Sequence, residues 1–413
     1  MKEYVERSAH IILTSERGRR ARLGKEDAMD DYFILIPAYE PDDRLLELVE
    51  ELRGRSGSLE ANLHVLVVDD GSRRPEAQAV FRRLEELAGQ AGPDSDSMPE
   101  MGESRTKTRE SRTETGFRLM LLRHPQNRGK GAALRTGLAY LRRLAEKPGV
   151  VVLMDADGQH RPGDALHLAH RCLYGANGLY LGSRHFSGKI PLRSKLGNRL
   201  TCQVFALVTG QKVSDTQTGL RAFCTAYIPK MCKIGGERYE YEMRMLLEFT
   251  GDRIPIYEVP IETIYEHNNA GSHFHAVRDS IRIYRVIFER IISFAGVSFA
   301  SFGLDYLLYA LMTLMIPVVG ANVLARLISA AFNYSMNRKL VFHHRGRLGR
   351  SLGRYALTAV LVLCADTCLV YGLTALGLGV LTAKLIAEPT IFIFSYLVQK
   401  NFVFVRKEVP YVA

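Results

Sequence analysis

Two acidic clusters follow short apolar runs in the first half of the chain. They are Asp69 and Asp70 after residues 64–68, and Asp155, Asp157 and Gln159 after residues 150–154. Such runs predict buried strands of a parallel sheet, whose carboxyl ends meet at the edge where open α/β sheets bind ligands. Asp155 and Asp157 stand two positions apart, and their oxygens suit a hard divalent cation, with Gln159 as a further ligand. An Asp-x-Asp pair also occurs in solvated loops, so the motifs around it have to decide whether this pair binds a metal.

The elements that would position these residues alternate between strand and helix. Apolar runs predict strands at 33–36, 64–68, 119–123 and 150–154, and helical periodicity predicts helices at 42–53, 76–88 and 130–144. Such alternation is typical of βαβ units with a parallel sheet. The polar segment 89–116, which has almost no large apolar residues, predicts a disordered surface insertion.

The second half of the chain has the composition of a membrane domain. Residues 291–399 contain apolar stretches long enough for helices of about 20 residues, the length that spans a bilayer. We predict spans near 293–315, 318–337, 355–376 and 378–398. The chain is therefore expected to be an integral membrane protein.

The distribution of charge indicates topology. The chain carries a net charge of +11. Among the loops of the predicted membrane domain, Lys and Arg lie between the second and third spans and after the fourth, whereas the other two turns have none. By the positive-inside rule, both termini and the middle loop are cytoplasmic. This explains the basic excess through topology and anionic lipid, so nucleic acid is not expected as a partner.

The leader 1–30 lacks the apolar core of a signal peptide, and the six cysteines show no CxxC spacing.

Two basic amphipathic stretches and one repeat accompany the spans. The stretch 193–210 either lies on a membrane surface or packs on the sheet, and both readings stay open. The stretch 276–292 leads into the first span, which favours an interfacial helix. Residues 332–342 match 394–404 at a constant offset, which predicts two two-helix units of the same orientation.

Four charged residues fall inside the predicted spans. They are Asp305, Arg326, Asp366 and Glu388. Charges at that depth are costly and either pair within the bundle or face a functional cavity, so the sequence leaves both roles open.

Further motifs lie between the acidic clusters and the membrane part. They are Pro37-Ala38-Tyr39-Glu40, Asn127-Arg128-Gly129-Lys130-Gly131-Ala132, Gly182-Ser183-Arg184 and Asp215–Arg221. In this order and spacing, residues 31–275 resemble family-two glycosyltransferases of the GT-A fold, in particular the polyprenyl-phosphate glycosyltransferases. Residues 293–407 resemble the GtrA-like four-helix membrane family. The resemblance implies a GT-A, Rossmann-like, mostly parallel α/β sheet followed by an all-α domain of four transmembrane helices.

The resemblance also implies roles for individual residues. The nucleotide sugar would contact Pro37, Tyr39, Glu40, Asp69, Asp70, Arg128, Lys130 and Asp155. Asp155, Asp157 and Gln159 would hold Mg²⁺ or Mn²⁺. The acceptor phosphate would meet Ser183, Arg184, Arg199, Arg221 and His273, and the candidate catalytic residues are Asp157, Arg184, Asp215 and Arg221. A phosphate acceptor is already anionic near neutral pH, so no general base is required.

The implied reaction moves a hexose from a UDP-sugar or GDP-mannose to a polyprenyl phosphate such as undecaprenyl phosphate. It would proceed with inversion at the cytoplasmic face of a bacterial inner membrane. One alternative is a processive polysaccharide synthase, whose Gln/Arg-x-x-Arg-Trp motif has no counterpart in a chain without Trp. Another is a flippase or transporter of lipid-linked sugars whose soluble domain only binds nucleotide. Whether the chain forms a homo-oligomer is left open.

Two positions depart from the family pattern. Glu40 is followed by Pro41 where many relatives read Asn-Glu, and His273 stands where many relatives have a Lys. The sequence therefore leaves open which nucleoside contacts Glu40 makes and whether His273 replaces that Lys at the phosphate.

Overall fold

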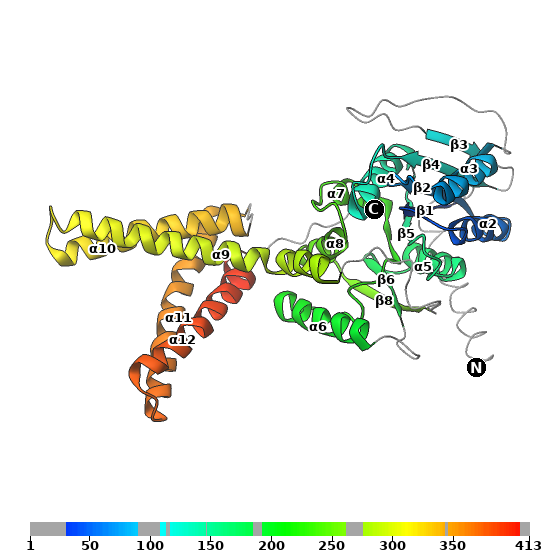
Figure 1. Cartoon of the computed structure of the whole chain (residues 1–413). Helices are drawn as coiled ribbons and strands as arrows, with labels where there is room; N and C mark the ends of the chain where they lie inside the picture. The colour runs from blue at the N-terminus through cyan, green and yellow to red at the C-terminus, as the bar shows by residue number, and fades with distance from the viewer. Residues whose placement is uncertain are drawn as a thin grey trace. The chain divides into compact units, whose positions relative to one another are not determined.

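The computed structural model describes residues 30–89, 108–112, 116–145, 147–184, 192–261, 276–342 and 346–404. The chain divides into two compact units, Met1–Val286 and Ile287–Ala413. Strands and helices alternate in the first unit, whereas the second consists of long helices (Figure 1).

A mixed sheet forms the centre of the first unit. Its strands in the described part of the chain are β1 (Asp30–Ala38), β2 (Ala61–Asp69), β3 (Thr108–Arg112), β4 (Phe117–Arg123), β5 (Gly149–Leu153), β6 (Leu179–Arg184), β7 (Arg221–Cys224) and β8 (Ile256–Ile261). They lie in the order β3-β4-β2-β1-β5-β7-β6-β8. β1 runs parallel to β2 and β5, β2 to β4, and β6 to β8, whereas β3 and β7 are antiparallel to their neighbours. The predicted, mostly parallel α/β sheet is thereby confirmed.

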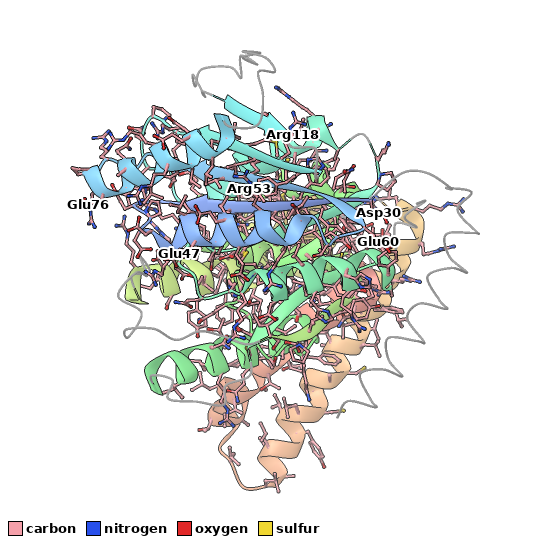
Figure 2. The ribbon with its side chains drawn as sticks, turned by 90° about the vertical axis from the view of Figure 1, so that its right-hand side faces the viewer. Asp30, Glu47, Arg53, Glu60, Glu76 and Arg118 are labelled. Atoms are coloured by element: carbon pink, nitrogen blue, oxygen red, sulfur yellow. The ribbon has the colours of Figure 1, made fainter. Side chains whose placement is uncertain are left out.

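Helices cover both faces of this sheet. On one face lie α2 (Arg44–Ser56), α3 (Pro75–Gly89) and α5 (Pro162–Tyr174), whose buried Leu52, Phe81 and Leu168 join Ile34 of β1 in one core. Fully burying each such side chain contributes about 1.5–3 kcal/mol. The opposite face of α2 carries charged residues that point outward, among them Glu47 (Figure 2).

The other face of the sheet carries α4 (Lys130–Leu144), α8 (Glu240–Gly251) and the short α7 (Ile228–Met231). A methyl group at Gly137 would overlap Leu35, so α4 packs directly on β1. Around them lie η1 (Thr225–Tyr227) and α6 (Leu192–Thr209). α6 buries Phe205 but exposes Leu196 and Leu207, so part of its apolar surface does not contact the first unit.

One sequence-based expectation about this unit is wrong for five residues. The segment 89–116 was expected to be disordered, yet Thr108–Arg112 forms the edge strand β3 against β4. An edge strand needs only backbone hydrogen bonds to its neighbour, so polar side chains do not prevent it. Residues 1–29, 90–107 and 113–115 lie outside the described part, and the leader and the rest of the insertion stay predictions.

The second unit contains the four long helices that the sequence predicts. They are α9 (Ala276–Met312, which begins before the unit boundary), α10 (Val318–Met336), α11 (Leu348–Ala375) and α12 (Val380–Val398). Among the described residues, Arg278–Met312 and Leu348–Ala375 are long and apolar enough to cross a membrane. The stretch 276–292 is continuous with α9, and α11 begins earlier than the expected span at 355. An interfacial position for 276–292 stays a prediction.

The predicted repeat is visible in the second unit. α10 and α12 each end in a π-helical turn, η3 (Asn337–Val341) and η4 (Gln399–Val403). Asn337 and Gln399, 62 positions apart, lie in contact, with the Asn337 Nδ2 donating to Gln399 Oε1 over 3.3 Å. The rings of Phe342 and Phe404 stack with centroids 4.9 Å apart. Equivalent residues of the two repeats thus meet each other.

Two of the charged residues within these helices, Asp305 and Arg326, contact each other. Arg326 Nη2 lies 3.5 Å from Asp305 Oδ2, and the Ser329 hydroxyl donates to Asp305 Oδ1 over 2.8 Å. This supports a role of Asp305 and Arg326 in holding α9 and α10 together, which was one of the two open readings.

Candidate active site

A cleft of about 830 Å³ opens where β1, β2 and β5 end. Its lining includes Tyr39 and Glu40 after β1, Asp70 after β2, and Asp155 and Asp157 after β5. The carboxyl ends of parallel strands are the place where open α/β sheets bind ligands. Asp70 of the first acidic cluster and Asp155 and Asp157 of the second therefore reach one cleft, whereas Asp69 and Gln159 are absent from its described lining.

Asp70 is tied to the loop that precedes α4. Its side chain is 3% exposed, and its carboxylate accepts the backbone N–H groups of Arg128 over 2.9 Å and Gly129 over 2.6 Å. The ring of His124 donates from Nδ1 to Asp70 Oδ1 over 2.7 Å, and its Nε2 lies 2.9 Å from Thr136 Oγ1. Asp70 thus fixes the backbone of this loop, in addition to lining the cleft.

The same loop places Lys130 at the start of α4. Gly129 has φ of +100°, and a methyl group there would overlap the carbonyl oxygen of Glu237. Only glycine fits this approach without a shift of the backbone. Lys130 is then the first residue of α4 and lines the cleft. The positive end of a helix dipole favours anions such as phosphate, and a lysine at that end adds to the preference.

Glu40 and Asp69 connect the turns after β1 and β2. Glu40, at φ +49°, accepts the N–H of Arg73 over 2.9 Å and donates its own N–H to Ser72 Oγ over 2.9 Å. Asp69 accepts the N–H of Ser72 over 2.8 Å, and Arg123 Nε lies 2.8 Å from its other oxygen. Burial outweighs these contacts and raises the pKa of Asp69. Of the two carboxylates, Glu40 lines the cleft and Asp69 is absent from its described lining.

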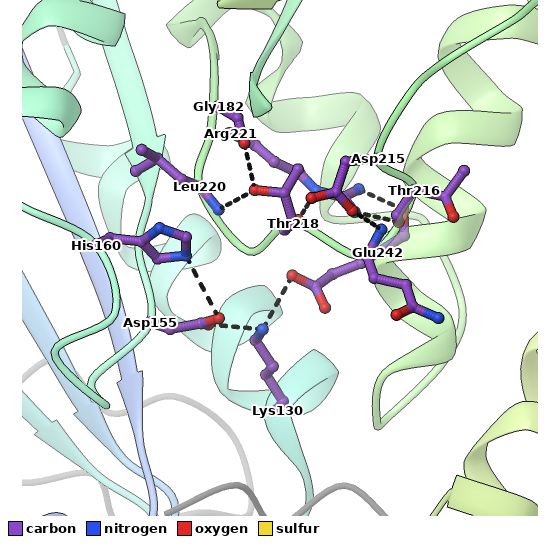
Figure 3. A network of polar contacts seen from close by, with 11 residues as sticks. Lys130, Asp155, His160, Gly182, Asp215, Thr216, Thr218, Leu220, Arg221 and Glu242 are labelled. Atoms are coloured by element: carbon purple, nitrogen blue, oxygen red, sulfur yellow. Dashed lines mark hydrogen bonds and ion pairs between the residues drawn. The ribbon is translucent and has the colours of Figure 1, made fainter. Parts of the chain in front are cut away.

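Lys130 joins two carboxylates from different elements (Figure 3). Its Nζ lies 2.6 Å from Asp155 Oδ1 and 3.0 Å from Glu242 Oε1 of α8. Burial alone lowers the pKa of Lys130, but these two carboxylates outweigh it, so the pKa is raised and the ammonium stays charged. His160 Nε2 lies 3.9 Å from Asp155 Oδ2 on the other side.

Asp157 and Asp155 have the electrostatics of a cation site. Burial, followed by the negative charge of Asp155, raises the pKa of Asp157 to about 6. The backbone N–H of Gln159 donates to Asp157 Oδ1 over 3.1 Å, which orients that carboxylate. The described residues contain no group of three or more His, Cys, Asp or Glu that could hold a metal alone. Two mutually repelling carboxylates fit a hard cation whose remaining ligands are phosphate oxygens and water.

Arg221 does not occupy the role that the sequence suggested. Its side chain is 0% exposed, and its guanidinium donates to the carbonyl oxygens of Thr218 over 2.9 Å, Glu242 over 2.5 Å and Thr216 over 3.2 Å (Figure 3). The expectation that Arg221 grips an acceptor phosphate is contradicted by this geometry, because its donors point into the protein. Arg221 instead fixes the segment 216–218 and the start of α8.

Asp215 belongs to the same buried segment. It is 0% exposed, and its Oδ1 accepts the N–H of Gln217 over 3.0 Å. Further along, a methyl group at Gly219 would overlap the carboxylate of Asp155, so this loop packs closely against the proposed metal ligand. Asp215 is therefore placed to shape the loop, and a direct catalytic role for it stays a prediction.

The other predicted site residues are spread over several elements. Pro37 lines the cleft. Arg128 contacts Asp70 through its backbone N–H, whereas its exposed side chain is absent from the described cleft lining. Ser183 is buried with its Oγ 2.6 Å from Ser214 Oγ, whereas Arg199 is exposed on α6. The side chain of Arg184 and all of His273 lie outside the described residues.

Sequence reasoning missed three side chains that support the site. They are Glu242, His124 and His160, which contact Lys130, Asp70 and Asp155 respectively. Lys130 and Glu242 are separated by 112 positions. No local spacing connects them, and only the packing of α8 beside α4 brings them together.

Comparison with known families identifies the two units. Residues 101–230 match the family described as Glycosyl transferase family 2, and residues 293–404 match GtrA/DPMS, transmembrane domain. The chain thus joins a segment that matches family 2 glycosyltransferases to one that matches the GtrA/DPMS transmembrane domain. The resemblance seen in the motifs is confirmed, and the protein is a membrane-bound transferase.

Several individual proteins are similar to this chain. An uncharacterized protein of Methanocaldococcus jannaschii is 26% identical over 267 residues, which are 63% of this chain and 93% of that protein. The UDP-N-acetylglucosamine–dolichyl-phosphate N-acetylglucosaminyltransferase of Methanococcus voltae is 28% identical over 238 residues, 56% of this chain and 85% of the relative.

Two solved structures illustrate the structural likeness. A mannosyltransferase from Pyrobaculum calidifontis, in complex with GDP-Man and Mn²⁺, is 15% identical with a TM-score of 0.36 over 95% of this chain and 94% of its own. Glucosyl-3-phosphoglycerate synthase from Mycobacterium tuberculosis, in complex with Mn²⁺, UDP and phosphoglyceric acid, is 13% identical with a TM-score of 0.40 over 63% and 78% of the respective chains. The chemistry of this chain therefore has to be argued from its own residues.

Proposed function

We propose that the protein transfers a hexose from a nucleoside diphosphate sugar, of the UDP-glucose type or GDP-mannose, to a polyprenyl phosphate. The observation that carries this proposal is the cluster of Lys130, Asp155 and Asp157 in one cleft of a chain whose second unit is transmembrane. A diphosphate needs cationic partners, and a lipid acceptor explains why the transferase is joined to a membrane domain. The name of the Methanococcus voltae relative, a dolichyl-phosphate transferase, supports the same acceptor class.

The donor would bind along the edge of the sheet. Asp155 and Asp157 would hold Mg²⁺ or Mn²⁺, which neutralises charge on the departing nucleoside diphosphate. Lys130 and the N-terminus of α4 supply further positive potential for the phosphates. Tyr39, which is 36% exposed in the cleft lining, offers a ring face to the nucleoside.

The acceptor phosphate would attack the anomeric carbon in line with the bond to the diphosphate. A bond from phosphate oxygen to carbon forms as the bond from carbon to diphosphate oxygen breaks, which inverts the configuration. The attacking oxygen is already an anion, so no side chain has to remove a proton. Ser183, Arg184, Arg199 and His273 stay candidates for the acceptor phosphate, and Arg221 is removed from that set. We place this reaction on the cytoplasmic side of a bacterial inner membrane, following the charge bias of the loops.

The proposal is tested with the full chain purified in detergent or lipid nanodiscs. Radiolabelled UDP- and GDP-sugars are offered one at a time with undecaprenyl phosphate and Mn²⁺, with EDTA as the metal-free control. We expect label from one donor in the organic phase, and none with EDTA. Asp157→Asn should abolish transfer, whereas Asp43→Asn, at an exposed carboxylate of the first unit, should retain it. Nucleotide binding without transfer from any donor would favour a transporter instead.

A further inference from the structure

Glu242 contacts a residue of the proposed donor site but has no role in the reaction described above. Its carboxylate lies 3.0 Å from Lys130 Nζ, and its side chain is only 9% exposed. It is absent from the described lining of the cleft, so it reaches the site through Lys130. The ring of Tyr239 lies beside this ammonium, with its centroid 5.7 Å from Lys130 Nζ.

The backbone of Glu242 is fixed from behind by Arg221. The guanidinium of Arg221, which is 0% exposed, donates to the Glu242 carbonyl oxygen over 2.5 Å. The same guanidinium holds the segment at Thr216 and Thr218. Arg221 thereby fixes the backbone of α8 at Glu242, from which the carboxylate reaches the ammonium of Lys130 at the end of its flexible four-carbon chain.

Lys130 is shared between this anchor and a carboxylate of the cleft. Its Nζ lies 2.6 Å from Asp155 Oδ1, nearer than to Glu242. An ammonium bound this closely competes with a divalent cation for the same oxygen. Moving a buried charge from one carboxylate to another costs far less than leaving it unpaired, since one partner is kept throughout.

We propose that Glu242 is a positioning residue that draws the Lys130 ammonium away from Asp155, so that Asp155 can accept the divalent cation and Lys130 can face the diphosphate. The inference rests on the proposed function, because it takes Asp155 as a metal ligand. It adds that the affinity for the cation is set by a residue outside the cleft, on α8.

A merely structural role for Glu242 predicts something different. Glu242 would then only neutralise a buried lysine. Its replacement would change the Mn²⁺ affinity only by long-range electrostatics or by lowering the stability of the protein. A double-mutant cycle separates the two, because an effect that passes through Lys130 disappears once Lys130 is replaced.

The experiment measures Mn²⁺ affinity by isothermal titration calorimetry on the full chain in nanodiscs, with UDP or GDP present. The variants are Glu242→Gln, Lys130→Gln and the double variant. Glu248→Gln is the matched control, because Glu248 lies on the same helix and faces Lys230 instead. We expect Glu242→Gln to weaken Mn²⁺ binding about tenfold, the scale of one charge-assisted hydrogen bond. In the Lys130→Gln background the same change should alter the affinity by less than about twofold.

Two outcomes overturn the inference. One is an unchanged affinity in Glu242→Gln, and the other is a loss of equal size in the Lys130→Gln background. If Glu242→Gln does not fold, Glu242→Asp replaces it, because aspartate keeps the charge but withdraws the carboxylate from Lys130. This variant should weaken Mn²⁺ binding to a lesser degree. An affinity equal to that of the wild type would contradict the inference. A wild-type protein that transfers sugar without binding Mn²⁺ would refute this inference and leave the transferase standing.

Discussion

The carboxylate of Asp70 and the imidazole of His124 lie 2.7 Å apart, and their side chains are 3% and 1% exposed. Asp70 also accepts two backbone N–H groups from the loop before α4. This buried pair therefore connects the end of β2 to the loop that positions Lys130. Sequence motifs assigned Asp70 to nucleotide contact alone, whereas the structure adds a supporting role.

Replacing Asp70 should impair both stability and donor binding. Asp70→Asn replaces one of the two acceptor oxygens with an NH₂ group, so the N–H of either Arg128 or Gly129 loses its acceptor, and the neutral amide is a weaker partner for His124. Breaking a buried charge-assisted cluster of this kind costs about 3 kcal/mol. We expect a lower melting temperature for the full chain and weaker UDP or GDP binding by calorimetry. Unchanged binding in a folded Asp70→Asn protein would show that this loop does not set the donor site.

The ionised carboxylate of Asp157 should lower the stability of the metal-free protein while it provides a ligand for the metal. Its pKa is raised from 3.8 to about 6, so stability associated with the protonated form is present below pH 4 and is lost as pH rises through 6. At pH 7.5 in EDTA, Asp157→Asn should therefore melt at a higher temperature than the wild type. Added Mn²⁺ should stabilise the wild type and leave the variant unaffected.

The reverse order of melting temperatures in EDTA would mean that the charge of Asp157 is compensated within the protein. Failure of Mn²⁺ to stabilise the wild type would count against a metal site at Asp155 and Asp157. Asp43→Asn serves as the control for a change of one surface charge, because Asp43 is exposed.

Arg221 and Arg199 should respond differently to substitution. Arg221→Met removes three hydrogen bonds to buried carbonyl oxygens, and each such oxygen left unsatisfied costs about 1–3 kcal/mol. We expect this variant to melt at a much lower temperature or to fail to fold. Arg199→Gln, on the exposed side of α6, should fold normally, and a rise in the KM for undecaprenyl phosphate would identify it as an acceptor contact. A stable Arg221→Met protein that loses only acceptor affinity would restore the role that the sequence suggested.

The contact between the repeats should stabilise the membrane unit. Asn337 is 0% exposed and donates to Asn333 Oδ1 over 2.8 Å as well as to Gln399. Polar contacts between transmembrane helices average about 0.6 kcal/mol and reach about 2 kcal/mol. We expect Asn337→Leu to lower the detergent-denaturation midpoint more than Ser335→Ala, which removes an exposed hydroxyl on the same helix. Equal midpoints would mean that the amides are not a structural contact in the membrane unit.

Local patterns in the sequence predicted a large part of this molecule. The runs at 33–36, 64–68 and 119–123 became β1, β2 and β4 because apolar strands of a parallel sheet are buried on both faces. The acidic residues that follow the run 64–68 and the run 150–154, most of which became β5, therefore meet at one edge of the sheet. The residues that were missed depend on pairings over long distances, such as Lys130 with Glu242 and β7 between β5 and β6. Arg221 was misread because a motif gives the residue type but not the burial of its side chain.

The central claim is that the sugar is joined to the phosphate of a lipid. The most direct measurement uses ³²P-labelled undecaprenyl phosphate and a nucleotide sugar labelled with ³H in its sugar, incubated with the full chain and Mn²⁺. We predict an organic-phase product that carries both labels in equal molar amounts. The Asp157→Asn variant should form no such doubly labelled product. Sugar label in a water-soluble polymer, or free sugar released without ³²P in the product, would contradict the account.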